Sequence, residues 1–383
     1  MNFIKEGKWA RMNRINELIK EYCPDGVPFE KVKNVYTRVK GTPITAGKMK
    51  EIACDDGEIR IFAGGKTIID AHENDIPKAN ITRVPAVLVQ SRGVIDVVYY
   101  DKPFTFKNEM WAYTSEDIVS VKFLYYVLKN SIQTFRDAAS GMGSLPQISL
   151  KVTEEFMLPV PPLEVQREIV HILDSFTLLT AELTAELTAR KKQYDFYRDK
   201  LLTFERDIPL LPLGEVCNLQ AGKAIKASGI SDVETNQATI PCYGANGLRG
   251  YVEKSNQEGD KSIIGRQGAQ CGNVCYATGK YYATEHAVVV TDKGHFNSRY
   301  LFHALTHANL NQYKTAGAQP GLSVAKLNDV IIAVPDKKIQ DKIANVLDNF
   351  EAICTDLNIG LPAEIEARQK QYEYYRDLLL TFA

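Results

Sequence analysis

The sequence lacks the features that would place it among membrane or secreted proteins. No stretch of the 383 residues reaches the roughly 18 apolar residues that a membrane-spanning helix needs. The segment from Met1 to Arg11 contains no apolar run, so it does not read as a secretory signal peptide. Met12 offers a second plausible start, and residues 1–11 are therefore expected to be an extension. These absences predict a soluble protein of the cytoplasm.

A disulfide framework is also missing. The seven cysteines are odd in number and widely scattered, which fits reduced thiols. Cys271 and Cys275, with His286 nearby, raise the alternative of a zinc site, but the paired spacing of structural zinc ligands is absent. Small buried side chains in strands are the favoured interpretation of these cysteines. We predict no metal site.

Motifs for catalysis are absent as well. The sequence contains no GxxxxGK[ST] phosphate loop, no Asn-Pro-Pro-Tyr-type methyltransferase motif and no carboxylates at nuclease spacing. The glycine pairs Gly64-Gly65 and Gly265-x-x-Gly268 are typical of turns. An enzyme alternative would use Cys275 as a nucleophile with His286 as its base, without support from any other residue. We expect a chain that is not catalytic by itself.

The sequence also lacks an excess of either positive or negative charge. Lys and Arg number 46 against 47 Asp and Glu, so the formal net charge is −1. A chain that binds DNA alone usually carries an excess of Lys and Arg. Any DNA binding must therefore use a local positive surface, or a partner must supply much of the charge.

An internal repeat dominates what is present. Pro161–Phe176 matches Pro335–Phe350 at an offset of 174 residues, and Arg190–Phe204 matches Arg368–Phe382 at an offset of 178. The second copy therefore holds four more residues between Phe350 and Arg368. Duplicated units of this kind predict a pseudo-two-fold internal repeat.

Both repeated segments are expected to form long helices. Apolar residues recur at steps of three and four over about 40 residues, or roughly 60 Å of helix, which is typical of a coiled-coil seam. Two such seams can pair with each other, most simply antiparallel. Gly360 and Pro362 are placed to interrupt the second helix, with Pro362 at the first position of a new one. The residues predicted to pack in the seam are Ile169, Leu173, Phe176, Leu183, Leu187, Tyr194, Tyr197, Ile343, Leu347, Phe350, Leu357, Ile365, Tyr372 and Tyr375.

Two globular parts precede the helices and resemble each other weakly. Val94–Tyr100 and Ala287–Thr291 read as strands, while Val121–Phe135 and Ser298–Tyr313 read as helices. The fold class is α+β. The predicted organisation is a 1–24 extension with a short helix, globular domains at 25–160 and 207–334, and long helices at 161–206 and 335–383.

The helical repeats carry a family resemblance. The motif Pro-x4-Gln-x2-Ile-x3-Leu-Asp-x-Phe, at 161–176 and 335–350, is similar to motifs of type I restriction–modification specificity subunits. The segment Gly360–Asp377 and the run Thr180–Leu187, two Thr-Ala-Glu-Leu units, also resemble that family. The resemblance covers roughly residues 13–383, and in the globular parts it extends only to the layout.

The resemblance implies two target recognition domains, each reading one half of a bipartite DNA site, with the helices fixing the gap. It implies docking of two modification (methyltransferase) subunits, and of restriction subunits in the full complex. S-adenosylmethionine, ATP and Mg²⁺ would then belong to these partners, with no cofactor on this chain. Because the two globular parts differ from each other, an asymmetric site is expected.

The candidates for DNA contact are polar and basic residues in the loops, since Arg suits guanine and Asn or Gln suits adenine. Most surface Lys and Arg are only solvated, which is the alternative for each of them. The candidates are Lys66, Arg83, Arg92, Lys107, Asn108, Asn246, Arg249, Lys254, Arg266, Gln267 and Gln270. Competing functions are a stand-alone DNA-binding protein, a silent recombination copy and a coiled-coil scaffold, the last of which leaves the two large globular parts unexplained.

Overall fold

The chain forms two compact units, each assembled from two separate stretches of sequence. In the computed structural model, unit 1 comprises residues 1–182 and 366–383, and unit 2 comprises residues 183–365. The structure describes residues 14–15, 17–64, 67–140, 145–204, 208–268, 270–315 and 320–382. The first 11 residues lie outside this range. The units therefore cut across the linear domains expected from the sequence, because each includes part of both long helical segments.

Helix α7 (Leu163–Leu202) is continuous over 40 residues. Its sequence holds neither Gly nor Pro, and Thr177 and Thr180 accommodate their hydroxyls by bonding the carbonyls four residues back. The second helical segment consists of α11 (Lys337–Thr355) and α12 (Leu361–Leu380). No helix of the described residues is long and apolar enough to cross a membrane.

The break between α11 and α12 lies where Gly360 and Pro362 predict it, but one seam prediction is wrong. Leu357 was expected in a continuous seam, but it lies in the connection and is 71% exposed. The Asp356 carboxylate accepts hydrogen bonds from the backbone N–H groups of Asn358 and Ile359, which favours a turn over another helical turn. Pro362 is the second residue of α12, where its missing N–H costs nothing. The four extra residues of the second copy are thus accommodated by an irregular connection.

The described strands of unit 1 form three small sheets. Strands β1 and β9 pair antiparallel, a second sheet has the order β2-β8-β5-β6, and a third has the order β4-β3-β7 with β3 and β7 parallel. Helix α4 packs on β5 and β6. The bounds are β1 Phe29–Lys31, α2 Val32–Val35, β2 Thr37–Val39, α3 Ala46–Ile52, β3 Ile59–Phe62, β4 Ile68–Ala71, η2 Glu73–Asp75, β5 Ala86–Gln90, β6 Asp96–Tyr100, β7 Phe104–Phe106, β8 Trp111–Thr114, α4 Ile118–Asn130, α5 Ile132–Asp137, α6 Leu150–Glu154 and β9 Met157–Pro159.

Unit 2 repeats this topology strand by strand. Strands β10 and β19 pair, a second sheet has the order β11-β18-β15-β16, and a third has the order β13-β12-β17-β14 with β12 and β17 parallel. Strand β14 is the one addition among the described strands. The bounds are β10 Leu210–Pro212, α8 Leu213–Val216, β11 Cys217–Ala221, η3 Ala227–Gly229, β12 Ile240–Gly244, β13 Gly247–Val252, β14 Gln257–Glu258, β15 Lys261–Gly265, β16 Val274–Ala277, β17 Lys280–Ala283, β18 Ala287–Asp292, α9 Ser298–His307, η4 Leu310–Tyr313, α10 Val324–Asn328 and β19 Ile331–Ala333.

The predicted elements differ from the observed ones mainly at their ends. The helix expected at Val121–Phe135 begins earlier, at Ile118, because Asp117 caps it by accepting bonds from two backbone N–H groups. It is also divided at Ser131 into α4 and α5. The helix expected at Ser298–Tyr313 ends at His307, and Asn309 with its positive φ of 46° starts a separate 3₁₀ turn.

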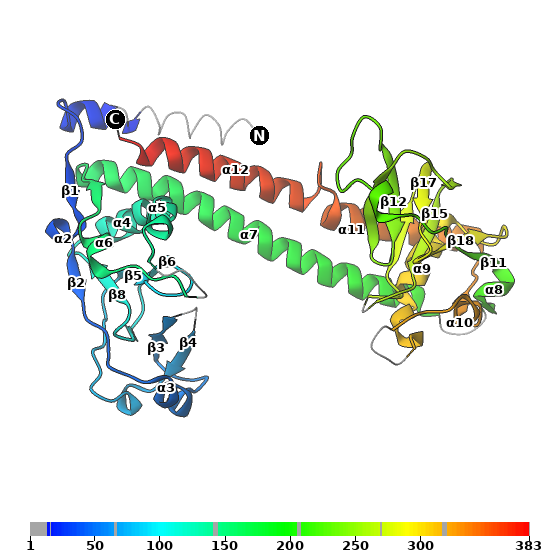
Figure 1. The fold of residues 1–383 in the computed structure, drawn as a ribbon, viewed down its shortest axis with the longest axis horizontal. Helices are drawn as coiled ribbons and strands as arrows, with labels where there is room; N and C mark the ends of the chain where they lie inside the picture. Colours follow the sequence, from blue (N-terminus) through cyan, green and yellow to red (C-terminus); the bar gives the residue numbers. More distant parts are fainter. Residues whose placement is uncertain are drawn as a thin grey trace. The chain divides into compact units, whose positions relative to one another are not determined.

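Each unit pairs a part of α7 with a part of the second helical segment. In unit 1 the C-terminal end of α12 lies beside the start of α7 (Figure 1), and Phe176 stacks on Tyr375 with ring centroids 5.4 Å apart. In unit 2 Tyr197 stacks on Phe350 at 5.3 Å. Phe350 is the repeat equivalent of Phe176, and Tyr375 is that of Tyr197. The same aromatic contact therefore occurs once in each unit.

Burial of the predicted seam residues follows these contacts. Ile169, Leu173, Phe176, Ile343 and Leu347 are buried in the cores of their units. Tyr197 remains 39% exposed despite its stacking. The half-buried seam residues are Leu183, Leu187, Tyr194, Phe350, Ile365, Tyr372 and Tyr375.

Candidate nucleic-acid interface

Three segments of unit 1 meet at the ends of strands β3, β5 and β7. A Cβ atom built on Gly64 would lie 3.7 Å from a carboxylate oxygen of Glu109 and 3.9 Å from the carbonyl of Arg92. The Nζ of Lys107 lies 3.0 Å from the Glu109 carboxylate, and the Ser91 hydroxyl donates to the Glu109 carbonyl. The structure thus brings together Arg92, Lys107 and Asn108, three of the residues selected from the sequence.

An open groove of about 590 Å³ adjoins this cluster. Asn108 and Gln147 line it, together with the basic residues Arg38 and Lys40 and the ring of Trp111. Gln147 reaches the cluster through a β-bridge to Arg92. The groove therefore presents amide groups, which can hydrogen-bond to base edges, and Lys40 beside the paired Arg38 and the Glu109 carboxylate.

The equivalent segments of unit 2 meet in the same way. The backbone N–H of Arg266 donates to the carbonyl of His286 at 2.9 Å, and the Asn273 amide lies 3.5 Å from that of Asn246. Gln267 forms a β-bridge to Gly321, as Arg92 does to Gln147 in unit 1. Gln270 joins the cluster through its carbonyl, which accepts from the Asn273 N–H. Four candidates, Asn246, Arg266, Gln267 and Gln270, are thus brought together.

Three side chains at this surface of unit 2 hold polar atoms that are buried and lack a partner. They are Nε of Arg266, an Oε of Glu285 and Nδ1 of His286. Glu285 and His286 contact each other through their remaining polar atoms at 3.2 Å. An unpartnered buried donor or acceptor costs about 1–3 kcal/mol. A ligand that supplies complementary groups would recover that cost, so these atoms favour a binding surface here.

The remaining candidates are distributed differently. Arg249 lies close to Gly244, where an added Cβ atom would be 3.5 Å from its Cδ, at the edge of the unit 2 cluster. Lys254 follows the far end of β13 and lines a separate groove with Ile225 and Tyr282. Arg83 forms an ion pair with Glu73, in a strongly acidic neighbourhood, and this pairing argues against a role in phosphate contact. Lys66 lies outside the described residues.

The structure gives no support to the two catalytic or metal alternatives for Cys275. Among the described residues, Cys271, Cys275 and His286 do not form a group of ligand atoms close enough to hold an ion. Burial raises the pKa of the Cys275 thiol, which disfavours the thiolate that a nucleophile needs. Cys271 is fully buried beside the core of unit 2, as expected of a small core residue.

The repeated helical motif anchors each globular part to its helix. Asp174 of α7 accepts bonds from Lys122 and Tyr126 of α4, each at 2.6 Å. In unit 2 the equivalent Asp348 accepts from Arg299 at 2.8 Å and from His303 at 2.7 Å. The aspartate of the Leu-Asp-x-Phe motif therefore has the same task in both copies, with different partners.

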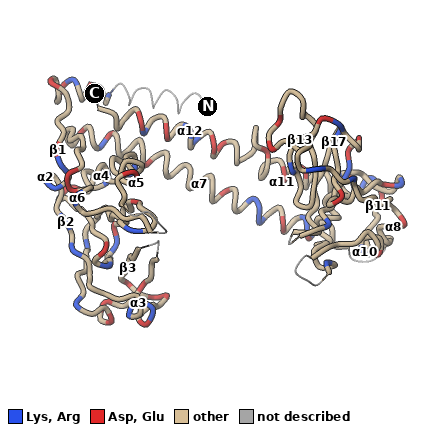
Figure 2. Tube along the Cα trace, viewed as in Figure 1, with Lys and Arg blue, Asp and Glu red and all other residues tan. Residues whose placement is uncertain are grey.

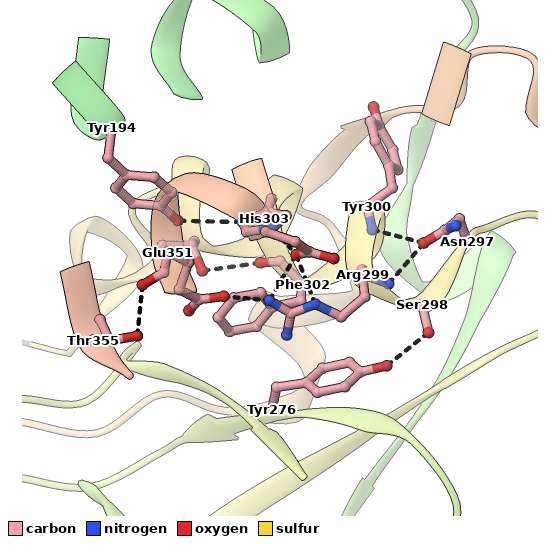
Figure 3. A network of polar contacts seen from close by, with 12 residues as sticks. Tyr194, Tyr276, Asn297, Ser298, Arg299, Tyr300, Phe302, His303, Glu351 and Thr355 are labelled. Atoms are coloured by element: carbon pink, nitrogen blue, oxygen red, sulfur yellow. Dashed lines mark hydrogen bonds and ion pairs between the residues drawn. The ribbon is translucent and has the colours of Figure 1, made fainter. Parts of the chain in front are cut away.

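The anchor of unit 2 is more extensive, as Figure 3 shows. The Arg299 guanidinium also pairs with Glu351 and lies over the rings of Tyr276 and Phe302, 4.4 and 4.6 Å from their centroids. Tyr194 of α7 completes the network by bonding Nδ1 of His303 at 3.2 Å. Burial lowers the pKa of His303, and the bond to Asp348 opposes that shift.

The glutamine of the motif closes the start of each helix. Gln166 donates to the carbonyl of Pro161, and Gln340 donates to that of Pro335, both at 2.8 Å. Gln340 also donates to the His295 carbonyl and accepts from the N–H of Asn297. The spacing Pro-x4-Gln thus has a local structural cause in both units.

Charge and apolar exposure add two features of the surface. Figure 2 shows Lys and Arg interspersed with Asp and Glu in both units, in agreement with the net charge near zero.

Phe196 and Tyr374 occupy equivalent positions of the repeat, and they are 60% and 65% exposed. The repeat therefore places one exposed aromatic side chain at the same position in each unit.

Comparison with known proteins agrees with this architecture. The family model for the type I restriction modification DNA specificity domain matches residues 39–190 and 207–367. The chain belongs to this family. Its two matches correspond to the two copies of the internal repeat and cover more than half of the chain.

Relatives and solved structures carry the same description. The chain is 42% identical over 255 residues to the EcoprrI type I restriction enzyme specificity subunit of Escherichia coli, and this alignment spans 63% of each chain. It is 29% identical over 360 residues to the Escherichia coli EcoR124I/EcoR124II specificity subunit, covering 86% of this chain and 88% of the relative. A crystal structure of a type I S subunit from M. genitalium shares the fold, with a TM-score of 0.63 and 20% identity over 92% of this chain and 95% of that one.

Sequence reasoning missed several residues of the interface. Ser91, Glu285 and His286 were not selected, although each belongs to the loops that the structure brings together. The signal was the alignment of the two copies, since Ser91 corresponds to Arg266 and Glu109 to His286. Reading the selected positions in both copies would have added Ser91, the counterpart of Arg266, and Glu285, the counterpart of Asn108, but not His286, whose counterpart Glu109 was not selected.

Proposed function

We propose that the chain is the DNA-specificity subunit of a type I restriction–modification complex, and that each unit reads one half of an asymmetric, interrupted DNA site. The observation that supports this most directly is the pair of equivalent loop clusters. They occupy the same strand ends in both units but carry different polar groups. Matching frames with different contact residues suit the reading of two different sequences.

The residues in each cluster suit groove contacts. In unit 1 Arg92 and Asn108 are exposed, and in unit 2 Gln267 and Gln270 are exposed. Arginine can form paired bonds to guanine, and Asn or Gln to adenine, each worth about 1–3 kcal/mol of discrimination. Because the chain has no excess of positive charge, phosphate binding by this chain alone should be weak at physiological salt.

Partner subunits would supply the missing charge and the chemistry. We propose that two modification subunits dock on the chain, one at each unit, with Phe196 and Tyr374 as apolar contacts. Restriction subunits would join in the full complex. S-adenosylmethionine, ATP and Mg²⁺ would be bound by these partners, with this chain non-catalytic and cytoplasmic. Tight binding of DNA by the isolated chain would argue against the proposal that the partner subunits supply much of the positive charge.

The experiment is sequencing of methylated adenines in single DNA molecules from a host that expresses this chain with its modification subunits. We expect one new methylated motif made of two unlike half-sites separated by a fixed gap. A palindromic motif would contradict the proposal. Unchanged methylation in a host whose complex assembles would favour the alternative, a stand-alone DNA-binding protein or a silent recombination copy.

A further inference from the structure

A second group of chemically competent side chains lies at the open end of the β3–β4 hairpin in unit 1. Cys54 and Asp56 precede β3, and His72 follows β4, whose last residue Ala71 pairs with Ile59. The thiol sulfur, a carboxylate oxygen and an imidazole nitrogen of these three residues lie within 4.8 Å of one another. The strands are four residues long, so about 13 Å separates this end from the turn near Gly64.

The imidazole of His72 is held in the orientation that a metal ligand needs. Its Nδ1 lies 2.8 Å from the Glu58 carboxylate, and its Nε2 lies 3.5 Å from that of Asp56. Glu58 is itself fixed by the backbone N–H of Glu73 at 2.9 Å. A carboxylate on one ring nitrogen, with the other nitrogen facing the ligands, is the usual support of a metal-binding histidine.

The backbone fixes the loop that carries Cys54 and Asp56. The N–H of Cys54 donates to the carbonyl of Asp70 at 3.0 Å. A Cβ atom on Gly57 would lie 2.2 Å from the backbone nitrogen of Ala71, so only glycine allows this close approach. The loop is thus pressed against the end of β4, beside His72.

The charge around the group is strongly negative. Asp55, Asp56, Glu58, Glu73 and Asp75 lie in or next to these loops, and Arg83 pairs with one of them, Glu73. The other such group among the described residues, His303 with Asp348 and Glu351, is already neutralised by Arg299. A cation is therefore favoured at the hairpin and disfavoured at the second group.

We propose that Cys54, Asp56 and His72 bind a zinc ion, with water as the fourth ligand. A thiolate, an imidazole and a carboxylate together suit zinc better than Mg²⁺ or Ca²⁺, which prefer oxygen ligands. Zinc bonds of about 2.0–2.3 Å place tetrahedral ligand atoms about 3.3–3.8 Å apart. The three groups need to close by only about 1 Å, within the reach of side-chain rotation.

The ion would fasten the loop before β3 to the residue after β4. This stiffens the hairpin whose opposite end contributes Gly64 to the interface of unit 1. The proposed role is structural and separate from base reading, since the site and the turn are at opposite ends of the strands.

The test is titration of the metal-free, full-length chain with Co²⁺ and Zn²⁺. One Co²⁺ per chain should bind with a thiolate-to-cobalt charge-transfer band, and Zn²⁺ should displace it. Cys54→Ser should abolish the band, and His72→Gln should weaken binding at least tenfold. Glu58→Gln, which removes only the orienting carboxylate, should weaken it about 10- to 100-fold.

Cys23→Ser and Cys275→Ser are the matched controls, because they remove other partly exposed thiols and should leave the titration unchanged. The ligands are at the surface, so all variants should keep the circular dichroism of the unaltered chain. Persistence of the band in Cys54→Ser would overturn the proposal. Loss of the band in a control variant, or binding of fewer than one Co²⁺ per unaltered chain, would also overturn it.

Discussion

The two units share their topology and differ in the side chains placed on it. The sheet orders β2-β8-β5-β6 and β11-β18-β15-β16 correspond strand by strand, and both third sheets contain one parallel pair. At equivalent loop positions of the repeat, unit 1 has Ser91 and Glu109 where unit 2 has Arg266 and His286. Backbone pairing holds the frame, which leaves loop residues free to differ at little cost in stability.

The two helical segments also differ, because only the first is a continuous helix. Helix α7 runs through Thr180–Leu187 without interruption, whereas α11 and α12 are broken between Thr355 and Leu361. The continuous helix α7 transmits an insertion along its axis as added length. The irregular connection between α11 and α12 can absorb an insertion without lengthening either helix. This difference gives the prediction with the largest expected effect.

Inserting one Thr-Ala-Glu-Leu unit after Leu187 should lengthen the gap of the recognised site by about one base pair. Four helical residues advance about 6 Å and rotate about 40° beyond a full turn. One base pair rotates about 34–36° and rises about 3.4 Å. Methylation at the original sites should be lost and should appear at sites with the longer gap. A four-residue insertion after Asn358 is the control and should leave the gap unchanged. An unchanged gap with the first insertion would refute the idea that the length of α7 sets the gap.

The two anchors should differ in strength. Asp348→Ala leaves Arg299 and the buried His303 without their shared partner and should cost about 2–4 kcal/mol. Asp174→Ala removes bonds from the more exposed Lys122 and from Tyr126, and should cost about 1–2 kcal/mol. Native-state hydrogen exchange of α9 and α4 measures the two losses separately. Equal losses would show that the larger network of unit 2 adds no stability.

Lowering the pH should destabilise the Asp348 anchor of unit 2 but not the Asp174 anchor of unit 1. This is the smallest of the predicted effects. The pKa of His303 is lowered by burial, so its contribution to stability is complete above the ordinary pKa of about 6.5 and is lost as the pH falls below it. The equivalent residue of unit 1, Tyr126, does not titrate in this range, because its pKa is raised. Hydrogen exchange at pH 7 and pH 5.5 should show faster opening of α9 but not of α4, and His303→Gln should remove the difference.

The sequence predicted the repeat well because its signal is long and periodic. Apolar steps of three and four locate α7 and α11, and the motif residues Gln166 and Gln340 proved to have equivalent bonds. The exposed Leu357 shows where periodicity fails: it cannot register that Asp356 would cap a turn and end the helix. A one-dimensional pattern carries no information on such local competition.

The candidate interface was predictable in part. Arg92 and Asn108 were selected as basic and polar residues of expected loops, and the structure brings them together. Arg83 was selected by the same rule, yet it pairs with Glu73. Which basic residue already has an acidic partner depends on contacts between distant segments, which the sequence alone does not provide. The zinc ligands were missed for that reason, since Cys54 and His72 are 18 positions apart.

The most direct test of the two-reader account compares two single substitutions at equivalent positions, Arg92→Ala in unit 1 and Gln267→Ala in unit 2. Each is made in the complete complex and followed by single-molecule sequencing of methylated adenines. We predict that each variant relaxes the base preference in one half-site only, that the two variants affect opposite halves, and that both keep the gap. If both substitutions altered the same half-site, or if neither altered any base preference, the account would be contradicted.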